Sequence, residues 1–231
     1  MLILSLDTSS KTASCALVSE DGIIAESFLN AKITHSATVM PMIEGLFKNS
    51  GRNISDVTMF AATNGPGSFT GVRIGASILL GLAFGKNAPC VGLSTLEVIA
   101  SPLCRLYPGE IICPVLDARR GQFYNALFKD GNRLTPDRAV SADELDAELK
   151  NTGGPAIICG DGYLIAKEKL SCDMIIPPAR LIYPSAAEAA YLSVSVYDKA
   201  EDKTVFSNKN FKPVYLRPSQ AERVKNNNAN L

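Results

Sequence analysis

Apolar runs of strand length open the chain. The runs at 2–8, 12–19 and 23–29 each hold enough apolar and β-branched residues for one strand. Asp21-Gly22 separates the last two runs. This pair is typical of a tight turn, because glycine adopts a positive φ without steric cost. The pattern therefore predicts a meander of three antiparallel strands.

The pattern then changes to an alternation of helices and strands. Apolar residues recur at the spacing of one helix face in three segments, and short apolar runs lie between them. The predicted elements are a helix at 36–49, a strand at 57–63, a helix at 70–84, a strand at 90–93 and a helix at 95–106.

The second half of the chain restarts in a similar way. The segment Pro114-Val115-Leu116-Asp117 resembles Leu4-Ser5-Leu6-Asp7, since each is an apolar strand that ends in aspartate before a polar turn. A returning strand at 122–128, a helix at 142–150, a strand at 156–159 and a helix at 185–197 follow. We interpret the two halves as a duplicated α/β unit with a cleft between two lobes.

The expected division is a first lobe at 1–102, a second lobe at 103–225 and a disordered polar tail at 226–231. No low-complexity linker separates the lobes. The helix at 185–197 can pack back on the first lobe.

Charge argues against a dedicated nucleic-acid-binding protein. The 231 residues include 23 Lys+Arg and 23 Asp+Glu, so the formal net charge is zero. Any RNA contact would need a local patch or a partner. Five basic residues near the end of the chain form either such a patch or a solvated tail: Lys209, Lys212, Arg217, Arg223 and Lys225.

Nothing in the sequence predicts a membrane segment. The longest apolar stretch, Ile74–Phe84, is shorter than the roughly 20 residues that a bilayer requires. The first residues read as a strand and lack the charged start of a signal peptide. Six cysteines without a C-x-x-C pair are expected to be buried free thiols, which suits a cytoplasmic location.

Three polar turns are candidates for a degenerate nucleotide site. Asp7 ends the first strand, where a phosphotransferase of two lobes would use it to organise a metal-bound water. The turn after Asp117 carries arginines where small residues would let the backbone approach a phosphate. Each turn could equally be a plain solvated turn. The candidate residues are Asp7, Thr8, Ser9, Asp117, Arg119, Gly160 and Gly162.

The glycine-rich segment before the helix at 70–84 is not a phosphate-binding P-loop, because it lacks the G-K-[ST] ending. Glycine inside a helix costs about 1 kcal/mol relative to alanine, so Gly75 needs a compensating reason. Close approach of another helix is one reason, and packing against the chain's own sheet is the other. His35 is the only histidine, so a metal site with two histidines cannot be built and a Ser-His-Asp triad would have to use His35. Capping or surface packing at the helix start is the expected role of His35.

Four motifs, in order, resemble the bacterial TsaB (YeaZ) family of tRNA threonylcarbamoyladenosine biosynthesis proteins. They are GPGSFTGVRIG at 65–75, VGLSTLE at 91–97, DARRGQFY at 117–124 and PVYLRPSQAE at 213–222. The resemblance covers about residues 1 to 224. It implies the two-lobed ASKHA fold (actin-like ATPase, ribonuclease H-like) with a duplicated mixed sheet.

The resemblance also implies a role in placing threonylcarbamoyl on the adenosine at position 37 of tRNAs that read codons beginning with adenine. The expected partners are a TsaD-like catalytic subunit, a TsaE-like ATPase and, through the complex, tRNA; a homodimer is expected when the chain is alone. TsaD-like proteins carry two metal-binding histidines where this chain has Thr95 and Ile99. The sequence therefore predicts no metal and no catalytic residues, and binding of ATP or ADP stays open.

The same resemblance places the partner interface on the helices at 36–49 and 70–84. The predicted interface residues are His35, Val39, Met40, Ile43, Leu46, Phe69, Val72, Gly75, Ala76 and Leu79. A non-catalytic scaffold or activator subunit is the leading hypothesis. An ATP-dependent small-molecule kinase of the same fold and a glycoprotease-like metallopeptidase are the alternatives.

Overall fold

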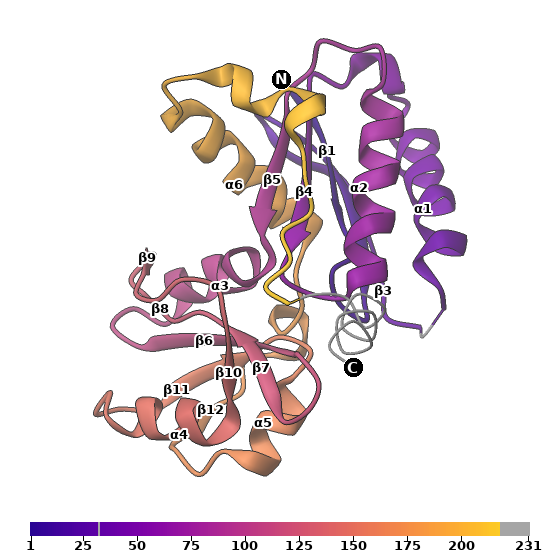
Figure 1. Ribbon diagram of the computed structural model, residues 1–231. Coiled ribbons are helices and arrows are strands. Elements are labelled where there is room, and N and C mark those ends of the chain that lie inside the picture. The colour runs from indigo at the N-terminus through magenta and orange to yellow at the C-terminus, as the bar shows by residue number, and fades with distance from the viewer. Residues whose placement is uncertain (32, 218–231) are drawn as a thin grey trace, which may run out of the picture.

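The computed structural model describes residues 1–31 and 33–217 of the chain, and these form two lobes that each contain a sheet (Figure 1). The predicted tail at 226–231 lies outside the described residues. Each lobe is built from a mixed sheet with helices packed on it.

The first sheet has five strands in the order β3-β2-β1-β4-β5. The antiparallel meander predicted from the apolar runs forms its first part, and β4 and β5 add to β1 in parallel. The strands are β1 (Leu2–Asp7), β2 (Ala13–Ser19), β3 (Gly22–Leu29), β4 (Met59–Gly65) and β5 (Cys90–Ser94). Because β1 is buried at every position, both faces of this sheet must be covered.

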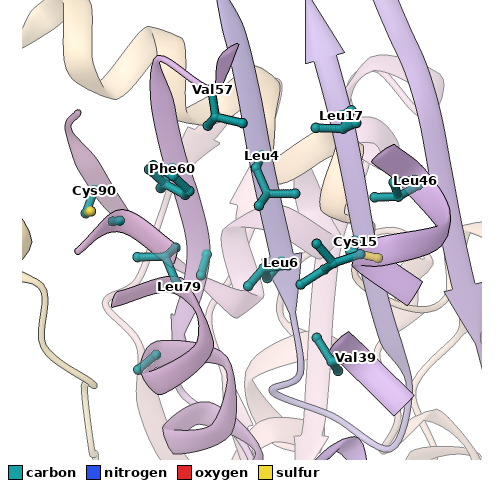
Figure 2. Close-up of a cluster of buried hydrophobic side chains, with 14 of the residues drawn as sticks. Leu4, Leu6, Cys15, Leu17, Val39, Leu46, Val57, Phe60, Leu79 and Cys90 are labelled. Carbon is teal, nitrogen blue, oxygen red and sulfur yellow. The ribbon is translucent and has the colours of Figure 1, made fainter. Parts of the chain in front are cut away.

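One face of the first sheet is covered by α1 (His35–Ser50) and α2 (Phe69–Ala83). Figure 2 shows Leu4 and Leu6 of β1 in the same buried cluster as Leu46 of α1 and Leu79 of α2. The helix α6 (Ala186–Lys199) covers the other face. Its alanines at 186, 187, 189 and 190 are buried against the strands, since small side chains let a helix lie close to a sheet.

The second sheet has the order β10-β7-β6-β11-β12, with a short hairpin of β8 and β9 beside β6. Its strands are β6 (Ile111–Asp117), β7 (Gln122–Asn125), β8 (Phe128–Lys129), β9 (Asn132–Arg133), β10 (Arg138–Ser141), β11 (Ala156–Cys159) and β12 (Met174–Ile175). The helices α4 (Ala142–Lys150) and α5 (Tyr163–Lys169) pack on one face, and α3 (Thr95–Leu106) packs on the other.

Four 3-10 turns complete the described chain: η1 (Ile54–Asp56), η2 (Ala179–Leu181), η3 (Lys203–Phe206) and η4 (Asn208–Asn210). The six cysteines are buried and unpaired, as predicted. Within the described part of the chain, no helix is both long enough and apolar enough to cross a bilayer.

One element prediction is wrong, and some short elements are absent from the predictions. The strand predicted at 122–128 is divided, because the buried Asn125 ends β7 and Phe128 then pairs with the opposite end of β6. The sequence also gave no sign of α5 or β10, since seven and four residues are too few to show a periodic pattern.

Candidate functional site

A cleft of about 910 Å³ lies between the two lobes. Its walls include the turn after β1 at 9–11, the segment before α1 at 33–36, the start of α2 at 66–71, the end of β6 at 116–119, Asp161, and residues 214–217 near the end of the described chain. These are the positions where the two halves of a duplicated fold face each other, and where the sequence predicted a degenerate nucleotide site.

Asp7 does not reach this cleft. Its side chain is buried, and its Oδ1 accepts hydrogen bonds from the Ser9 amide (3.3 Å), the Ser9 hydroxyl (2.5 Å) and the Thr63 hydroxyl (2.5 Å). Burial raises the pKa of Asp7 to about 6, although these hydrogen bonds favour the charged form. The prediction that Asp7 faces the cleft is therefore wrong; it organises the turn beneath the surface.

The start of α2 covers the same turn. A Cβ at Gly67 would overlap the Ser9 carbonyl, and a Cβ at Gly71 would overlap the Thr8 carbonyl. The Ser68 amide donates to the Ser9 carbonyl (2.7 Å). The glycines of this segment therefore serve close packing inside the chain, which is one of the two reasons that the sequence left open.

Three backbone amides of the turn already have acceptors. The Ser9 amide donates to Asp7, the Lys11 amide donates to Asp161 Oδ2 (3.3 Å) and the Thr12 amide donates to the Ser10 hydroxyl (3.2 Å). A phosphate held in the manner of a nucleotide-binding turn needs such amides to be available. These three amides are therefore not free to bind a nucleotide phosphate.

The corresponding turn of the second lobe lies in the cleft wall. Arg119 and Arg120 have positive φ values of 65° and 57°, a conformation that costs a non-glycine residue roughly 1 kcal/mol. Asp117 holds this turn by accepting the Arg119 amide (2.8 Å) and by pairing with its guanidinium (3.2 Å). Asp117 and Arg119 thus line the cleft, as predicted, but their side chains form an ion pair with each other.

Gly160 and Gly162 lie behind the cleft wall. Gly160 has a φ of 89°, and a Cβ there would overlap the Val115 carbonyl; a Cβ at Gly162 would lie 3.1 Å from the same oxygen. Both glycines let this turn pack on β6. Between them, Asp161 does line the cleft, although it is not among the residues predicted from the sequence.

Asp161 joins the two lobes. Its Oδ2 accepts the Lys11 amide of the first lobe and its Oδ1 accepts the Asp117 amide of the second, both at 3.3 Å. Burial raises the pKa of Asp161 above its ordinary value. Of the seven predicted nucleotide-site residues, Ser9, Asp117 and Arg119 line the cleft; Asp7, Thr8, Gly160 and Gly162 do not.

Most of the predicted partner interface is also inside the chain. Seven of its residues are buried and belong to the core or pack on the turn after β1, so they cannot present side chains to a partner as predicted: Val39, Ile43, Leu46, Val72, Gly75, Ala76 and Leu79. They alternate with exposed positions of the same two helices, because one face of each helix packs on the sheet. His35 is turned toward the cleft, where its Nε2–H donates to the Ser10 carbonyl (2.9 Å).

Met40 and Phe69 are the interface residues that remain at the surface. They line a groove of about 440 Å³ between α1 and α2, together with Arg73. The Arg73 guanidinium lies 3.9 Å from the centre of the Phe69 ring, and its Nε–H donates to the Tyr215 hydroxyl (2.9 Å). The groove therefore has a rigid, partly cationic wall on α2.

Thr95 and Ile99 lie at the start of α3 and are both buried, at 0% and 1% exposure. Ile99 packs with Leu103 and Phe128 in the core under the second sheet. In the described ranges, no three His, Cys, Asp or Glu side chains gather as a metal-binding group.

Comparison with known proteins agrees with the two-lobed architecture. The chain is 32% identical to the tRNA threonylcarbamoyladenosine biosynthesis protein TsaB of Bacillus subtilis (strain 168) and 31% identical to that of Escherichia coli (strain K12); each match covers 96% of both chains. The crystal structure of a Pseudomonas aeruginosa protein with similarity to peptidase YeaZ has a TM-score of 0.77 at 24% identity, over 94% of this chain and 99% of that one. The predicted ASKHA fold is confirmed.

The family model described as TsaD, tRNA N6-adenosine threonylcarbamoyltransferase, matches residues 19–176. This range includes the glycine-rich segment, the Thr95–Ile99 region and the Asp117 turn. Three of the four motifs on which the family resemblance rests lie there. With the nearly full-length relatives, it establishes that the chain belongs to the TsaB (YeaZ) family of tRNA threonylcarbamoyladenosine biosynthesis proteins.

Proposed function

We propose that this protein is a non-catalytic scaffold or activator subunit in tRNA threonylcarbamoyladenosine formation. It acts in the cytoplasm with a TsaD-like catalytic subunit and a TsaE-like ATPase. The complex transfers threonylcarbamoyl to the adenosine beside the anticodon of tRNAs that read codons beginning with adenine. The relatives named TsaB and the match to the TsaD family model support the process.

One observation carries the non-catalytic assignment. Thr95 and Ile99 occupy the places of the two histidines in the TsaD-like pattern, and both side chains point into the protein core. An isoleucine has no donor atom, and the buried hydroxyl of Thr95 alone cannot replace two imidazoles as ligands. This helix face contributes to core packing in place of metal binding.

The exposed groove between α1 and α2 supports the assembly part of the proposal. An exposed Met40 beside Phe69 and Arg73 combines the residue types that are enriched at protein interfaces. We assign this groove to the TsaD-like subunit and, when the chain is alone, to a second copy of the chain. The buried neighbours of Met40 fix the two helices and hold the groove in shape.

The two alternatives have less support. A kinase of this fold would need Asp7 in the cleft, but Asp7 is buried and three amides of its turn already have acceptors. A metallopeptidase would need metal ligands at the positions of Thr95 and Ile99, but Ile99 has no donor atom and packs among apolar side chains.

Reconstitution tests the proposal. The chain is mixed with its TsaD-like and TsaE-like partners, tRNA, ATP and a threonylcarbamoyl donor, and each protein is then omitted in turn. We expect modification only with all three, and no turnover by this chain alone. Full modification without this chain would refute the proposal, and threonylcarbamoyl transfer by this chain alone would refute its non-catalytic part.

A further inference from the structure

A second large groove lies in the first lobe, at the far end of α2 from the cleft. Its volume is about 870 Å³, and it runs between the end of α2, the segment before β5 and the turns η3 and η4. Figure 1 shows these segments at the top of the first lobe, away from the second lobe. Neither the cleft nor the groove between α1 and α2 shares a residue with it.

All the charged residues that line this groove are lysines: Lys86, Lys203 and Lys209. Lys86 Nζ donates to the Ile54 carbonyl (2.8 Å), which uses one of its three N–H donors and holds the ammonium in place. Among the described residues, one carboxylate pairs with these ammonium groups: Asp198 lies 4.0 Å from Lys203. The groove therefore concentrates positive charge on a chain whose net charge is zero.

Aromatic rings stand beside these lysines. Lys203 lies 4.2 Å above the Tyr197 ring, and Tyr197 packs on Phe206 at 5.4 Å between ring centres. On the opposite wall, the Phe84 side chain is 84% exposed immediately after the last turn of α2. A large aromatic ring held in water next to ammonium groups offers a surface on which a base can stack.

We propose that this groove binds RNA, with the three lysines on backbone phosphates and Phe84 as a stacking surface for an unpaired base. The combination of clustered lysines and an exposed aromatic ring is the pattern by which proteins hold single-stranded segments without reading their sequence. The open shape and the amide side chains of Asn87 and Asn208 also suit a polar polymer better than an enclosed apolar ligand. The inference rests on the proposed function, because tRNA is the RNA that this protein would meet.

The groove divides the basic cluster that the sequence predicted. Lys209 belongs to it, but Arg217 donates to the Ala118 carbonyl (3.0 Å) in the cleft region. Arg223 and Lys225 lie outside the described residues. The sequence could not group Lys86 with Lys203 and Lys209, since more than 100 positions separate them along the chain.

The test measures tRNA binding to the assembled complex. We compare the wild-type chain with the variant Lys86→Gln/Lys203→Gln/Lys209→Gln by fluorescence anisotropy with a tRNA that reads an adenine-initial codon, across a salt series. We expect the Kd near 0.1 M salt to rise at least about 10-fold and the slope of log K against log salt to fall by about 2 to 3, since each lost phosphate contact removes roughly 0.7 to 0.9. The kcat at saturating tRNA should stay within about 2-fold.

A matched variant removes the same charge elsewhere. Lys129→Gln/Lys167→Gln/Lys169→Gln changes three exposed lysines of the second lobe and should leave Kd and slope unchanged. The double variant Lys203→Gln/Lys209→Gln retains the Lys86 bond to Ile54, so a folding defect from losing that bond cannot arise. Its salt slope should fall by about two thirds of the change expected for the triple variant.

An unchanged Kd and slope in the groove variants would overturn the inference. Loss of assembly with normal tRNA affinity would also overturn it and would assign the groove to a protein partner. If the complex modifies tRNA equally well without this chain, the proposed function fails. In that case, the slope of log K against log salt is measured for tRNA binding to the isolated wild-type and variant chains. This comparison tests whether the groove binds RNA independently of the proposed function.

Discussion

The Thr8 hydroxyl lies directly under Gly75. A Cβ at Gly75 would overlap Thr8 Oγ1, and this oxygen donates a hydrogen bond to the Gly71 carbonyl one helical turn earlier (2.7 Å). The helix α2 therefore sits on the turn after β1 with no space for a side chain. The contact explains why glycine occupies a buried helical position that would otherwise favour alanine.

Gly75→Ala should destabilise the isolated chain. The added methyl group must push α2 from the turn, at a typical overpacking cost of about 1 to 3 kcal/mol, and the better helix propensity of alanine returns about 1 kcal/mol. We expect a net loss of up to about 2 kcal/mol in the free energy of unfolding, measured by urea denaturation.

Gly81→Ala is the matched control in the same helix. Nothing lies within 4 Å of a Cβ at Gly81, so this change should stabilise the chain by about 0.5 to 1 kcal/mol. The pair Gly75→Ala/Thr8→Ala should lose less stability than the sum of the single changes, because removing Oγ1 relieves the overlap. Equal effects of Gly75→Ala and Gly81→Ala would contradict this account.

Much of the fold could be predicted from local pattern. Asp21-Gly22 joins β2 to β3 with Gly22 at a φ of 125°, and the helical spacing at 36–49 and 70–84 marks α1 and α2 to within one residue at most ends. Local pattern also shows which positions of a helix are apolar. It cannot show whether those apolar positions face the chain's own sheet or a partner.

That ambiguity accounts for the errors at the candidate site. The interface prediction includes Leu79 and Ala76, but both belong to the core cluster with residues of β1 and β4. Asp7 was assigned to the cleft because it ends a strand, and only the packing of α2 on the turn shows that it is enclosed. Asp161 was passed over because its role depends on two amides that lie 150 and 44 positions away in sequence.

The buried Asp7 should make stability depend on pH. Its pKa is about 6 in the folded chain against 3.8 for the ordinary group, so the folded state keeps a proton that the unfolded state has lost between these values. The contribution of Asp7 to the free energy of unfolding is therefore greatest below about pH 4. It falls as the pH rises to about 6 and is constant at higher pH. The fall amounts to about 3 kcal/mol, at roughly 1.4 kcal/mol per pH unit.

Asp7→Asn isolates this effect, because the amide cannot ionise. The difference in unfolding free energy between wild type and Asp7→Asn should change by about 2 kcal/mol between pH 4 and pH 7, in favour of the variant at the higher pH. Thr63→Val removes a hydroxyl that stabilises the charged form of Asp7. The fall in the free energy of unfolding should therefore extend to higher pH in this variant. A difference that is the same at both pH values would show that Asp7 does not titrate in this window.

Met40→Glu should prevent partner binding without unfolding the chain. Met40 is 36% exposed and lines the groove between α1 and α2, so a carboxylate there remains hydrated in the isolated chain but would be buried at an interface. We expect affinity for the TsaD-like subunit to fall at least about 10-fold, measured by calorimetry, with an unchanged circular dichroism spectrum.

Leu164→Glu provides the matched control for that change. Leu164 is an exposed apolar residue of α5 in the second lobe, far in sequence from α1 and outside the groove. Its substitution should leave partner affinity within about 2-fold. If Met40→Glu also left affinity unchanged, the docking surface would have to lie elsewhere on the chain.

Asp161→Ala should loosen the contact between the two lobes. It removes the acceptors of the Lys11 and Asp117 amides, each of which would then lose a hydrogen bond worth about 1 kcal/mol in the folded state. Hydrogen exchange at these two amides should quicken by roughly 5- to 10-fold, while the amides inside β1 and β6 keep their protection. Asp173→Ala changes an exposed carboxylate of the same lobe and should leave both amides unaffected. Unchanged exchange at Lys11 in the Asp161 variant would mean that the cleft is held by other contacts, with the Arg217 bond to Ala118 as the next to remove.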